Sequence, residues 1–218
     1  MSDDERAPVR VLIVDDHEMF ASSLAQALAA EDELLVVGVA TSLEAARSQT
    51  SVTAPDVILL DHRLPDGDGV SAIPELQSLR PSAQIVIITA TTSDRLLLAA
   101  LEGGAAGFIA KTQPLDDVID GVRAAAQGES VVSPKLLSRL LPRVRRRRGT
   151  PATTLTEREG EILDLLAQGL QNADIAEQLS LSVHTVRNHV ANLSAKLGAH
   201  SKLEVLAIAV RDGLVDAS

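Results

Sequence analysis

The sequence lacks cysteine, tryptophan and tyrosine, and Phe20 and Phe108 are its only phenylalanines. Without cysteine, the chain can form no disulfide, no Cys-ligated zinc site and no thiol-based active site. With so few aromatic residues, its cores must be built from Leu, Val, Ile and Ala. No apolar run approaches the ~18 residues needed to cross a membrane, and the acidic start of the chain is unlike a secretory signal. We therefore expect a cytoplasmic protein.

Basic residues are scarce in the first part of the chain. Residues 1–129 hold 8 Lys and Arg against 21 Asp and Glu, a net charge of −13. Residues 130–218 hold 12 against 9, a net charge of +3. The total of 218 residues is enough for one large or two small domains. Two stretches that differ so much in charge are expected to have different partners.

Strand-like and helix-like segments alternate up to about residue 128. Short apolar runs predict strands at Val9–Val14, Leu34–Ala40, Val57–Leu60, Gln84–Ile88 and Gly107–Ala110. Helical periodicity predicts helices at Phe20–Ala29, Leu43–Gln49, Val70–Leu79, Leu96–Leu101 and Leu115–Ala126. Five such β-α units predict an α/β domain with a parallel sheet covered on both faces. In the flavodoxin-like strand order, 2-1-3-4-5, the ligand crevice lies between strands one and three.

Carboxylates follow two of these predicted strands. Asp15 and Asp16 follow the first and Asp61 follows the third, so all three meet at the crevice if the strands are neighbours. Bound Mg2+ would relieve their mutual repulsion. Asp61 is the candidate nucleophile, because a carboxylate can accept a phosphoryl group, and Thr89 and Lys111 could bind that group. Any single Asp could instead cap a helix or turn, but the five residues together favour a site.

Two other groupings near the crevice are weaker. His17 and His62 could contribute to a zinc site, but two separated histidines without cysteine are weak evidence for one. The segment Asp66-Gly-Asp-Gly69 resembles a calcium loop superficially. It lacks the full spacing and the closing glutamate, so we expect a turn there.

Proline and arginine mark a change after Gly128. A short helix is predicted at Pro134–Leu141, and the segment from Arg143 to Thr154 has the composition of an exposed linker. The run Arg143–Arg148 could contact DNA phosphates, lie against the acidic first domain or stay solvated. We place the domains at residues 1–128 and 153–218, with a linker at 129–152.

From residue 155 onward the apolar period is helical throughout. Four short helices are predicted, each after a capping residue. Thr156 and Glu159 form a capping box before the first, Asn172 caps a helix that runs through Leu179, Ser182 caps Val183–Leu197, and a second capping box of Ser201 and Glu204 precedes Leu203–Val210. The second and third have helix-turn-helix proportions. No acidic residue occurs between Glu177 and Glu204. The exposed polar residues expected near the start of the third helix are of types that reach DNA bases or phosphates: His184, Thr185, Arg187 and Asn188. A helical protein-interaction domain is the alternative, because residues 151–218 carry a net charge of −4.

The first domain resembles the receiver domain of bacterial two-component response regulators over residues 9–128. The matching motifs are Val14-Asp-Asp-His17, Leu60-Asp-His-Arg-Leu-Pro-Asp-Gly-Asp-Gly69, Ile88-Thr-Ala90 and Gly107-Phe-Ile-Ala-Lys111. The resemblance implies that a histidine kinase phosphorylates Asp61, that Lys111 pairs with the phosphate, and that Thr89 and Phe108 form a switch pair. It also implies an Mg2+ site formed by Asp16, Asp61 and the Arg63 backbone carbonyl, with Asp15 reaching the ion through water.

Two positions depart from the commonest receiver pattern. Arg63 replaces the Asn or Met often found there, which leaves the backbone contact to metal intact but puts the phosphate lifetime in doubt. Phe108 stands where Tyr is common, so its ring can rotate inward but cannot donate a hydrogen bond.

The second domain is similar to the LuxR-type helix-turn-helix over residues 153–213. The matching motifs are Leu155-Thr-Glu-Arg-Glu159, Leu166-Ala-Gln-Gly-Leu170, Asp174-Ile-Ala-Glu-Gln-Leu179, Leu181-Ser-x-x-Thr-Val-Arg-Asn-His189 and Lys196-Leu-Gly198. With the receiver domain, this resemblance indicates the NarL/FixJ class of transcription regulators. By analogy, Arg187, Asn188 and Ala191 face the bases of double-stranded DNA, and Lys196 is a further candidate contact.

The last predicted helix is apolar nearly all round, with Glu204 its only polar residue between 203 and 210. Such a helix is buried on more than one side, and a domain this small can cover only one. We therefore expect a homodimer contact through Val205, Ile208 and Ala209, with four residues facing the domain core: Leu203, Leu206, Ala207 and Val210. A two-fold dimer would match palindromic half-sites.

These observations favour a non-enzymatic DNA-binding transcription regulator switched by phosphorylation. Its expected partners are a histidine kinase, DNA and a second copy of the chain, with RNA polymerase as a further candidate. One alternative is an orphan regulator of the same fold controlled by a ligand or a partner protein. A less favoured alternative is an Asp-nucleophile phosphatase of the haloacid dehalogenase type, which needs a second Asp where Arg63 stands.

Overall fold

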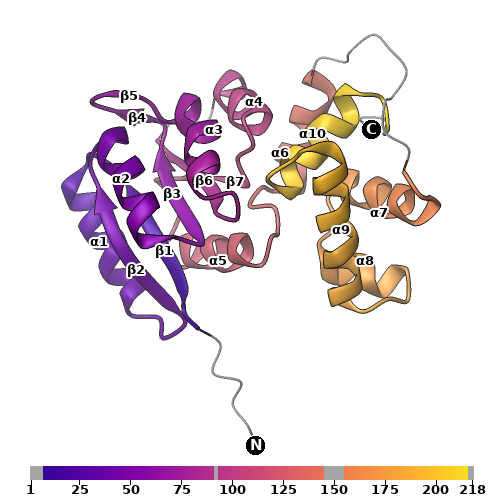
Figure 1. Ribbon diagram of the computed structural model, residues 1–218, viewed down its shortest axis with the longest axis horizontal. Coiled ribbons are helices and arrows are strands. Elements are labelled where there is room, and N and C mark those ends of the chain that lie inside the picture. Colours follow the sequence, from indigo (N-terminus) through magenta and orange to yellow (C-terminus); the bar gives the residue numbers. More distant parts are fainter. Residues whose placement is uncertain (1–6, 91–92, 145–154, 216–218) are drawn as a thin grey trace, which may run out of the picture.

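The computed structural model describes residues 7–90, 93–144 and 155–215. They form an α/β part and a smaller helical part that lie side by side (Figure 1). The elements of the α/β part are β1 (Val9–Val14), α1 (Glu18–Ala29), β2 (Leu34–Ala40), α2 (Leu43–Thr53), β3 (Val57–Asp61), β4 (Arg63–Leu64), β5 (Gly67–Asp68), α3 (Gly69–Leu79), β6 (Gln84–Thr89), α4 (Asp94–Glu102), β7 (Gly107–Ala110) and α5 (Leu115–Ala126). Those that follow are α6 (Pro134–Leu140), the 3-10 turn η1 (Leu141–Arg143), α7 (Glu157–Ala167), α8 (Asn172–Gln178), α9 (Val183–Leu197) and α10 (Lys202–Arg211).

The five long strands form one parallel sheet in the order β2-β1-β3-β6-β7. This is the flavodoxin-like order predicted from the sequence, with β1 and β3 as neighbours at the switch point. The register aligns Asp61 with Ile88 and Thr89 with Ala110. The carboxyl ends of β3, β6 and β7 therefore lie at one edge of the sheet.

Alternating residues of each strand supply two separate apolar layers. Leu12 and Val14 face one layer, which contains buried residues of α2, α3 and α4. Val11 and Ile13 face the other, which contains buried residues of α1 and α5. Because both faces are covered, the central strands are almost continuously apolar, and this is why their short runs are recognisable in the sequence.

A short hairpin, whose strands β4 and β5 have two residues each, connects the end of β3 at Asp61 to α3. The side chain of Asp66 accepts hydrogen bonds from the first backbone N–H groups of α2, at Leu43 and Glu44, and Asp68 caps α3. The Asp-Gly-Asp-Gly segment is therefore a turn that caps two helices, as expected from its incomplete resemblance to a calcium loop.

The helical part begins with the capping box predicted from the sequence, in which Thr156 and Glu159 satisfy each other's backbone N–H groups. Ser182 caps α9 through a hydrogen bond from the backbone N–H of Thr185. One predicted cap is wrong: Asn172 is the first residue of α8, and Gln171 precedes it as the cap. The α8–α9 pair keeps helix-turn-helix proportions.

The two parts share an apolar interface between α4 and α10 (Figure 1). Leu101 of α4 belongs to the same buried cluster as residues of α6, α7, α8, α9 and α10. Ion pairs add to this contact, because Asp94 at the start of α4 pairs with Arg139, at 2.8 Å, and with Arg143. Arg143 thus lies against the α/β part, whereas Arg145–Arg148 and the predicted domain limit at residue 153 lie outside the described residues.

This interface changes the expectation for the last helix. Val205, Ile208 and Ala209, the predicted dimer surface, are buried within the chain, with 0–8% of their surface exposed. The helix α10 is covered on a second side, as its apolar pattern predicts, but part of that cover is α4 of the same chain. A dimer through these residues remains a prediction that requires the two parts to separate.

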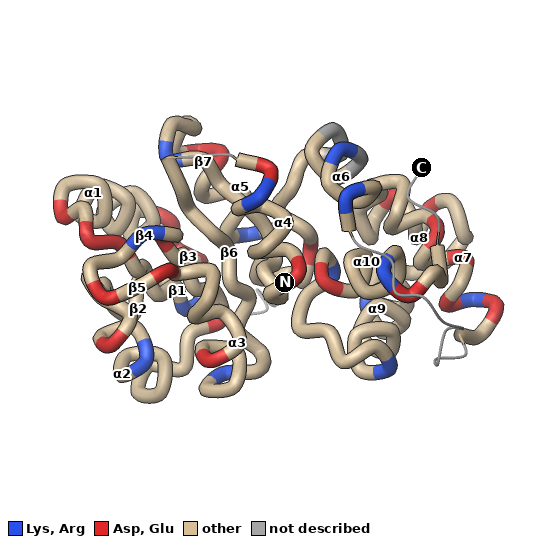
Figure 2. Tube along the Cα trace, turned by 90° about the horizontal axis from the view of Figure 1, so that it is seen from above, with Lys and Arg blue, Asp and Glu red and all other residues tan. Residues whose placement is uncertain are grey.

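Two further features concern the charge of the α/β part and the length of the helices. Asp and Glu are spread over the α/β part, including the sheet edge at which β3 ends (Figure 2). No helix within the described residues is both long and apolar enough to span a membrane.

Candidate functional site

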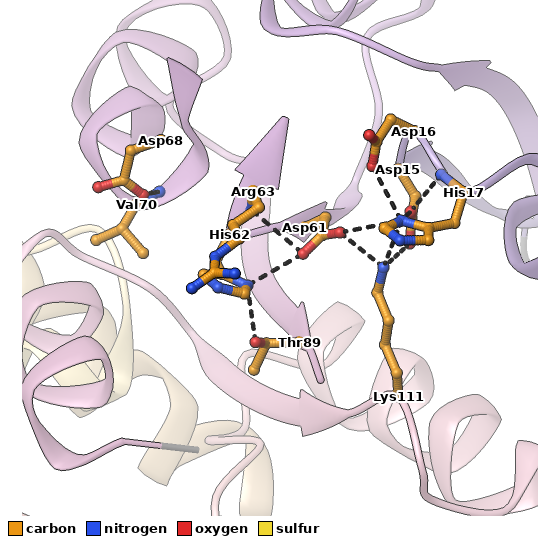
Figure 3. A network of polar contacts seen from close by, with 10 residues as sticks. All are labelled: Asp15, Asp16, His17, Asp61, His62, Arg63, Asp68, Val70, Thr89 and Lys111. Carbon is orange, nitrogen blue, oxygen red and sulfur yellow. Dashed lines mark hydrogen bonds and ion pairs between the residues drawn. The ribbon is translucent and has the colours of Figure 1, made fainter. Parts of the chain in front are cut away.

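Three charged groups meet at the sheet edge (Figure 3). Asp15 follows β1, Asp61 ends β3 and Lys111 follows β7. The Lys111 Nζ atom lies 2.6 Å from Asp15 Oδ2 and 2.6 Å from Asp61 Oδ2. Both carboxylates are buried, with 0% and 2% of the residue exposed. Burial favours the neutral amine of Lys111, but hydrogen bonds to Asp15 and Asp61 outweigh that effect and raise its pKa. Lys111 therefore stays cationic between two buried acids.

His17 completes an acidic cluster beside Lys111. Its Nδ1 atom lies 3.0 Å from Asp15 Oδ1, 2.9 Å from Asp16 Oδ1 and 3.8 Å from Asp61 Oδ2. Ligand atoms of these four residues all lie within 4.8 Å of one another. Three carboxylates supply the hard oxygen donors that Mg2+ prefers, and Asp16 is open to solvent, so the donor set fits that ion.

His62 lies on the opposite side of Asp61 from Lys111 (Figure 3). Its Nδ1 atom is 3.2 Å from Asp61 Oδ1 and 2.8 Å from the hydroxyl of Thr89. The backbone N–H of Arg63 also points to Asp61 Oδ1, at 3.3 Å. Thr89 lies beside the acceptor as predicted, but the histidine that connects the two was not predicted from the sequence.

Phe108 occupies a position between the two parts of the molecule. It is half-buried on β7 and packs against the apolar cluster of the sheet and also against the cluster that contains α10. In the sheet it is the neighbour of Ile87, two positions before the end of β6 at Thr89. A movement of this ring would therefore alter packing on both sides.

The predicted DNA-contacting residues lie along α9. His184, Asn188 and Ala191 are exposed, whereas Arg187 is half-buried and donates a hydrogen bond from Nη2 to Gln127 Oε1 of the α/β part, at 2.9 Å. Thr185 shares a hydrogen bond with Ser182 at 2.8 Å. A cavity of about 310 Å³ beside Arg187 is lined by Val190, Ala191 and Ser194 of α9 and by Gln84 and Gln127.

Lys196, the last predicted contact, is engaged within the helical part. Its Nζ atom pairs with Glu159 Oε2 at 2.6 Å. The hydrogen bond from Lys196, followed by that from the Thr156 backbone, lowers the pKa of Glu159 despite its burial. Glu159 thus links the start of α7 to the end of α9.

Comparisons with known proteins match both parts of the chain. Residues 11–123 match the response regulator receiver domain, and residues 153–209 match the bacterial regulatory proteins of the luxR family. The response regulator protein VraR of Staphylococcus epidermidis is 34% identical over 95% of this chain and 99% of its own length.

The chain belongs to the response regulators.

Two solved structures illustrate the likeness of this response regulator to its relatives. The receiver domain of the putative response regulator NarL from Mycobacterium tuberculosis is 32% identical over 56% of this chain and 99% of that one, with a TM-score of 0.54. The RcsB response regulator of Salmonella typhimurium is 25% identical over 91% of this chain and 96% of that one, with a TM-score of 0.55. These matches place the chain in the NarL/LuxR class that its motifs indicated.

A buried ion pair joins the DNA-binding domain of this response regulator to the segment that follows α5. Lys202, at the start of α10, lies 2.8 Å from Glu129 Oε2, just after α5, and only 5% of the lysine is exposed. Burial lowers the pKa of Lys202, and the attraction of Glu129 offsets only part of that effect. Next to it, the hydroxyl of Ser201 donates to the backbone oxygen of Ala105 at 2.9 Å. This pair could not be predicted from the sequence, because no local pattern relates residues 73 positions apart.

Proposed function

We propose that this response regulator is a transcription regulator whose DNA binding is switched by phosphorylation of Asp61 by a partner histidine kinase. The observation that carries the proposal is the closed arrangement, in which Arg187 is bonded to the receiver domain and α10 is packed on α4. The same receiver domain carries the acidic cluster, so a chemical change there can alter access to the DNA-binding face.

Asp61 is the proposed phosphoryl acceptor. Its carboxylate lies at the end of β3 with Lys111 on one oxygen, and Lys111 can move with that oxygen to pair with a phosphoryl group. Asp16, Asp61 and the Arg63 carbonyl are the proposed ligands of Mg2+, with Asp15 acting through water. A cation held there would neutralise the carboxylates and the phosphoryl oxygens.

The proposed signal path runs through Thr89 and Phe108. A phosphoryl group on Asp61 adds negative charge and acceptor oxygens within reach of the Thr89 hydroxyl. Movement of Thr89 towards that group changes the space beside β6, into which Phe108 can rotate. Because Phe108 contacts both apolar clusters, its rotation weakens the packing of α10 on α4.

Opening would expose two surfaces at once. Arg187 would become free to contact DNA together with Asn188 and Ala191. Val205, Ile208 and Ala209 would become free to form the predicted homodimer, and dimerisation would add to DNA affinity by mass action. Phosphorylation contributes only through its unequal stabilisation of the closed and open states, and about 5.5 kcal/mol is needed for a swing from 1:99 to 99:1.

The test uses the full chain and a DNA duplex selected from a random pool by the phosphorylated protein. Acetyl phosphate with Mg2+ is expected to produce an acyl phosphate and to raise DNA affinity, and Asp61→Asn is expected to prevent both. Asp56→Asn is the matched control, because Asp56 immediately precedes β3, at the end of the strand away from the acidic cluster. If Asp61 is modified while DNA affinity and oligomeric state stay unchanged, the proposed switch is wrong.

A further inference from the structure

His62 is held in one place by the turn that follows it. Its backbone oxygen accepts a hydrogen bond from the N–H of Gly69, at 3.0 Å. A Cβ atom on Gly69 would lie 2.0 Å from the backbone oxygen of Asp61, so only glycine allows this approach. The imidazole itself is 12% exposed. The side chain of His62 is therefore fixed beside the sheet edge rather than free to swing into solvent.

One atom of this imidazole contacts both the acceptor and the switch residue (Figure 3). Nδ1 lies 3.2 Å from Asp61 Oδ1 and 2.8 Å from Thr89 Oγ1. A carboxylate only accepts hydrogen bonds, so Nδ1 carries the hydrogen when it bonds to Asp61. The same N–H is then directed to the oxygen of Thr89. The other oxygen of Asp61 is held by Lys111, at 2.6 Å.

We propose that His62 is a positioning residue that holds Thr89 in its unphosphorylated position and so sets the threshold of the switch. The inference rests on the proposed function, because it concerns the same Asp61 and Thr89. When Thr89 moves to a phosphoryl group on Asp61, its contact with His62 is lost. The contact therefore stabilises only the unphosphorylated state and shifts the population towards it.

The size of the effect on DNA affinity follows from the net free energy that one partly buried hydrogen bond contributes. Its removal is expected to raise the DNA affinity of the unphosphorylated protein roughly 3- to 10-fold. The affinity of the fully phosphorylated protein is expected to change little. The ratio between the two affinities, which is the response to phosphate, therefore falls by about the same factor.

Two substitutions separate the hydrogen bond from the bulk of the ring. His62→Asn places an amide near the position of Nδ1 and is expected to retain the wild-type response. His62→Phe fills the space without a donor and is expected to give the full rise in basal affinity. Both are measured in the full chain with and without acetyl phosphate and Mg2+, together with the amount of acyl phosphate formed.

A double-mutant cycle tests whether His62 acts through Thr89. In the Thr89→Ala background, His62→Phe is expected to have no further effect on basal DNA affinity. Equal behaviour of His62→Asn and His62→Phe, or an undiminished effect of His62→Phe in Thr89→Ala, would overturn the inference. Either result can occur while wild-type protein still responds to phosphate, whereas a wild type that gains acyl phosphate without any change in DNA affinity refutes the proposed function itself.

Discussion

Arg187 of α9 donates a hydrogen bond to Gln127 of the receiver domain, so a predicted DNA contact is occupied within the chain. This bond turns the guanidinium towards the receiver domain. If Arg187 contacts DNA as proposed, DNA and the receiver domain would compete for the same face of α9. The proposed regulator would then have an off state that needs no additional partner.

Replacement of Arg187 separates the two roles of this residue. We expect Arg187→Ala to cost about 1–3 kcal/mol of specific DNA binding if the side chain reads a guanine, with relaxed specificity at one position. If it contacts a phosphate, the loss is expected to be uniform across sequences, and the salt slope falls by ~1. Arg211→Ala, at the end of α10, is the control. Titration of fluorescent DNA duplexes measures the affinity of both variants. An unchanged affinity of Arg187→Ala would contradict the assignment of Arg187 as a DNA contact.

Glu129→Gln is expected to open the closed arrangement. It leaves Lys202 buried without a counter-ion, a situation that typically costs about 3–5 kcal/mol. Separation of the domains relieves that cost by exposing Lys202 to water. We expect higher DNA affinity without phosphate and a larger radius of gyration by small-angle X-ray scattering. Glu31→Gln, which removes a surface pair with Arg123, should leave both quantities unchanged.

Thr89→Ala is expected to separate phosphorylation from its effect. The acceptor and Lys111 remain in place, so the variant should still form an acyl phosphate with acetyl phosphate and Mg2+. Its DNA affinity should respond weakly, because the hydroxyl that is proposed to move to the phosphoryl group is gone. Thr50→Ala, at a buried threonine of α2, is the control for loss of a hydroxyl in the core. A full response from Thr89→Ala would exclude this residue from the signal path.

The Glu159–Lys196 pair predicts an acid-sensitive helical domain. The pKa of Glu159 is lowered below its ordinary value of 4.5 by Lys196 and the Thr156 backbone. A carboxyl group with a lowered folded-state pKa stabilises the fold above its unfolded value and loses that contribution as pH falls through the folded value. We expect the free energy of unfolding to decrease as the pH falls below about 4.5. Glu159→Gln keeps the capping box but removes the charge that pairs with Lys196, so it should lose about 1 kcal/mol at pH 7 and show a weaker dependence on acid. Urea unfolding between pH 3 and 7 measures the difference, and parallel curves would contradict it.

The sheet and its acidic edge could be predicted from the sequence because each depends on a local pattern. Buried parallel strands are short apolar runs, and Asp61 lies at the end of one of them. The proximity of Asp15 and Lys111 then followed from strand order alone. The N-caps Thr156 and Ser182 were likewise evident from residue type and spacing.

Contacts between elements distant in sequence could not be predicted from local patterns. The bond from His62 to Thr89 depends on how the β4–β5 hairpin turns the chain after β3, which no periodicity specifies. The packing of α4 against α10 could not be predicted for a related reason. An apolar helix face indicates that something packs on it, but a second copy and another domain of the same chain produce the same pattern.

The shared apolar cluster around Leu101 has a consequence for how the protein melts. Leu101 of the receiver domain lies in one buried cluster with Leu137 and Leu141 and with residues of four helices of the DNA-binding domain. Neither domain can lose its structure without exposing part of the other's core. Calorimetry of the unphosphorylated chain should therefore show one heat-absorption peak whose calorimetric and van't Hoff enthalpies agree. Once the domains separate, that single peak should divide into two.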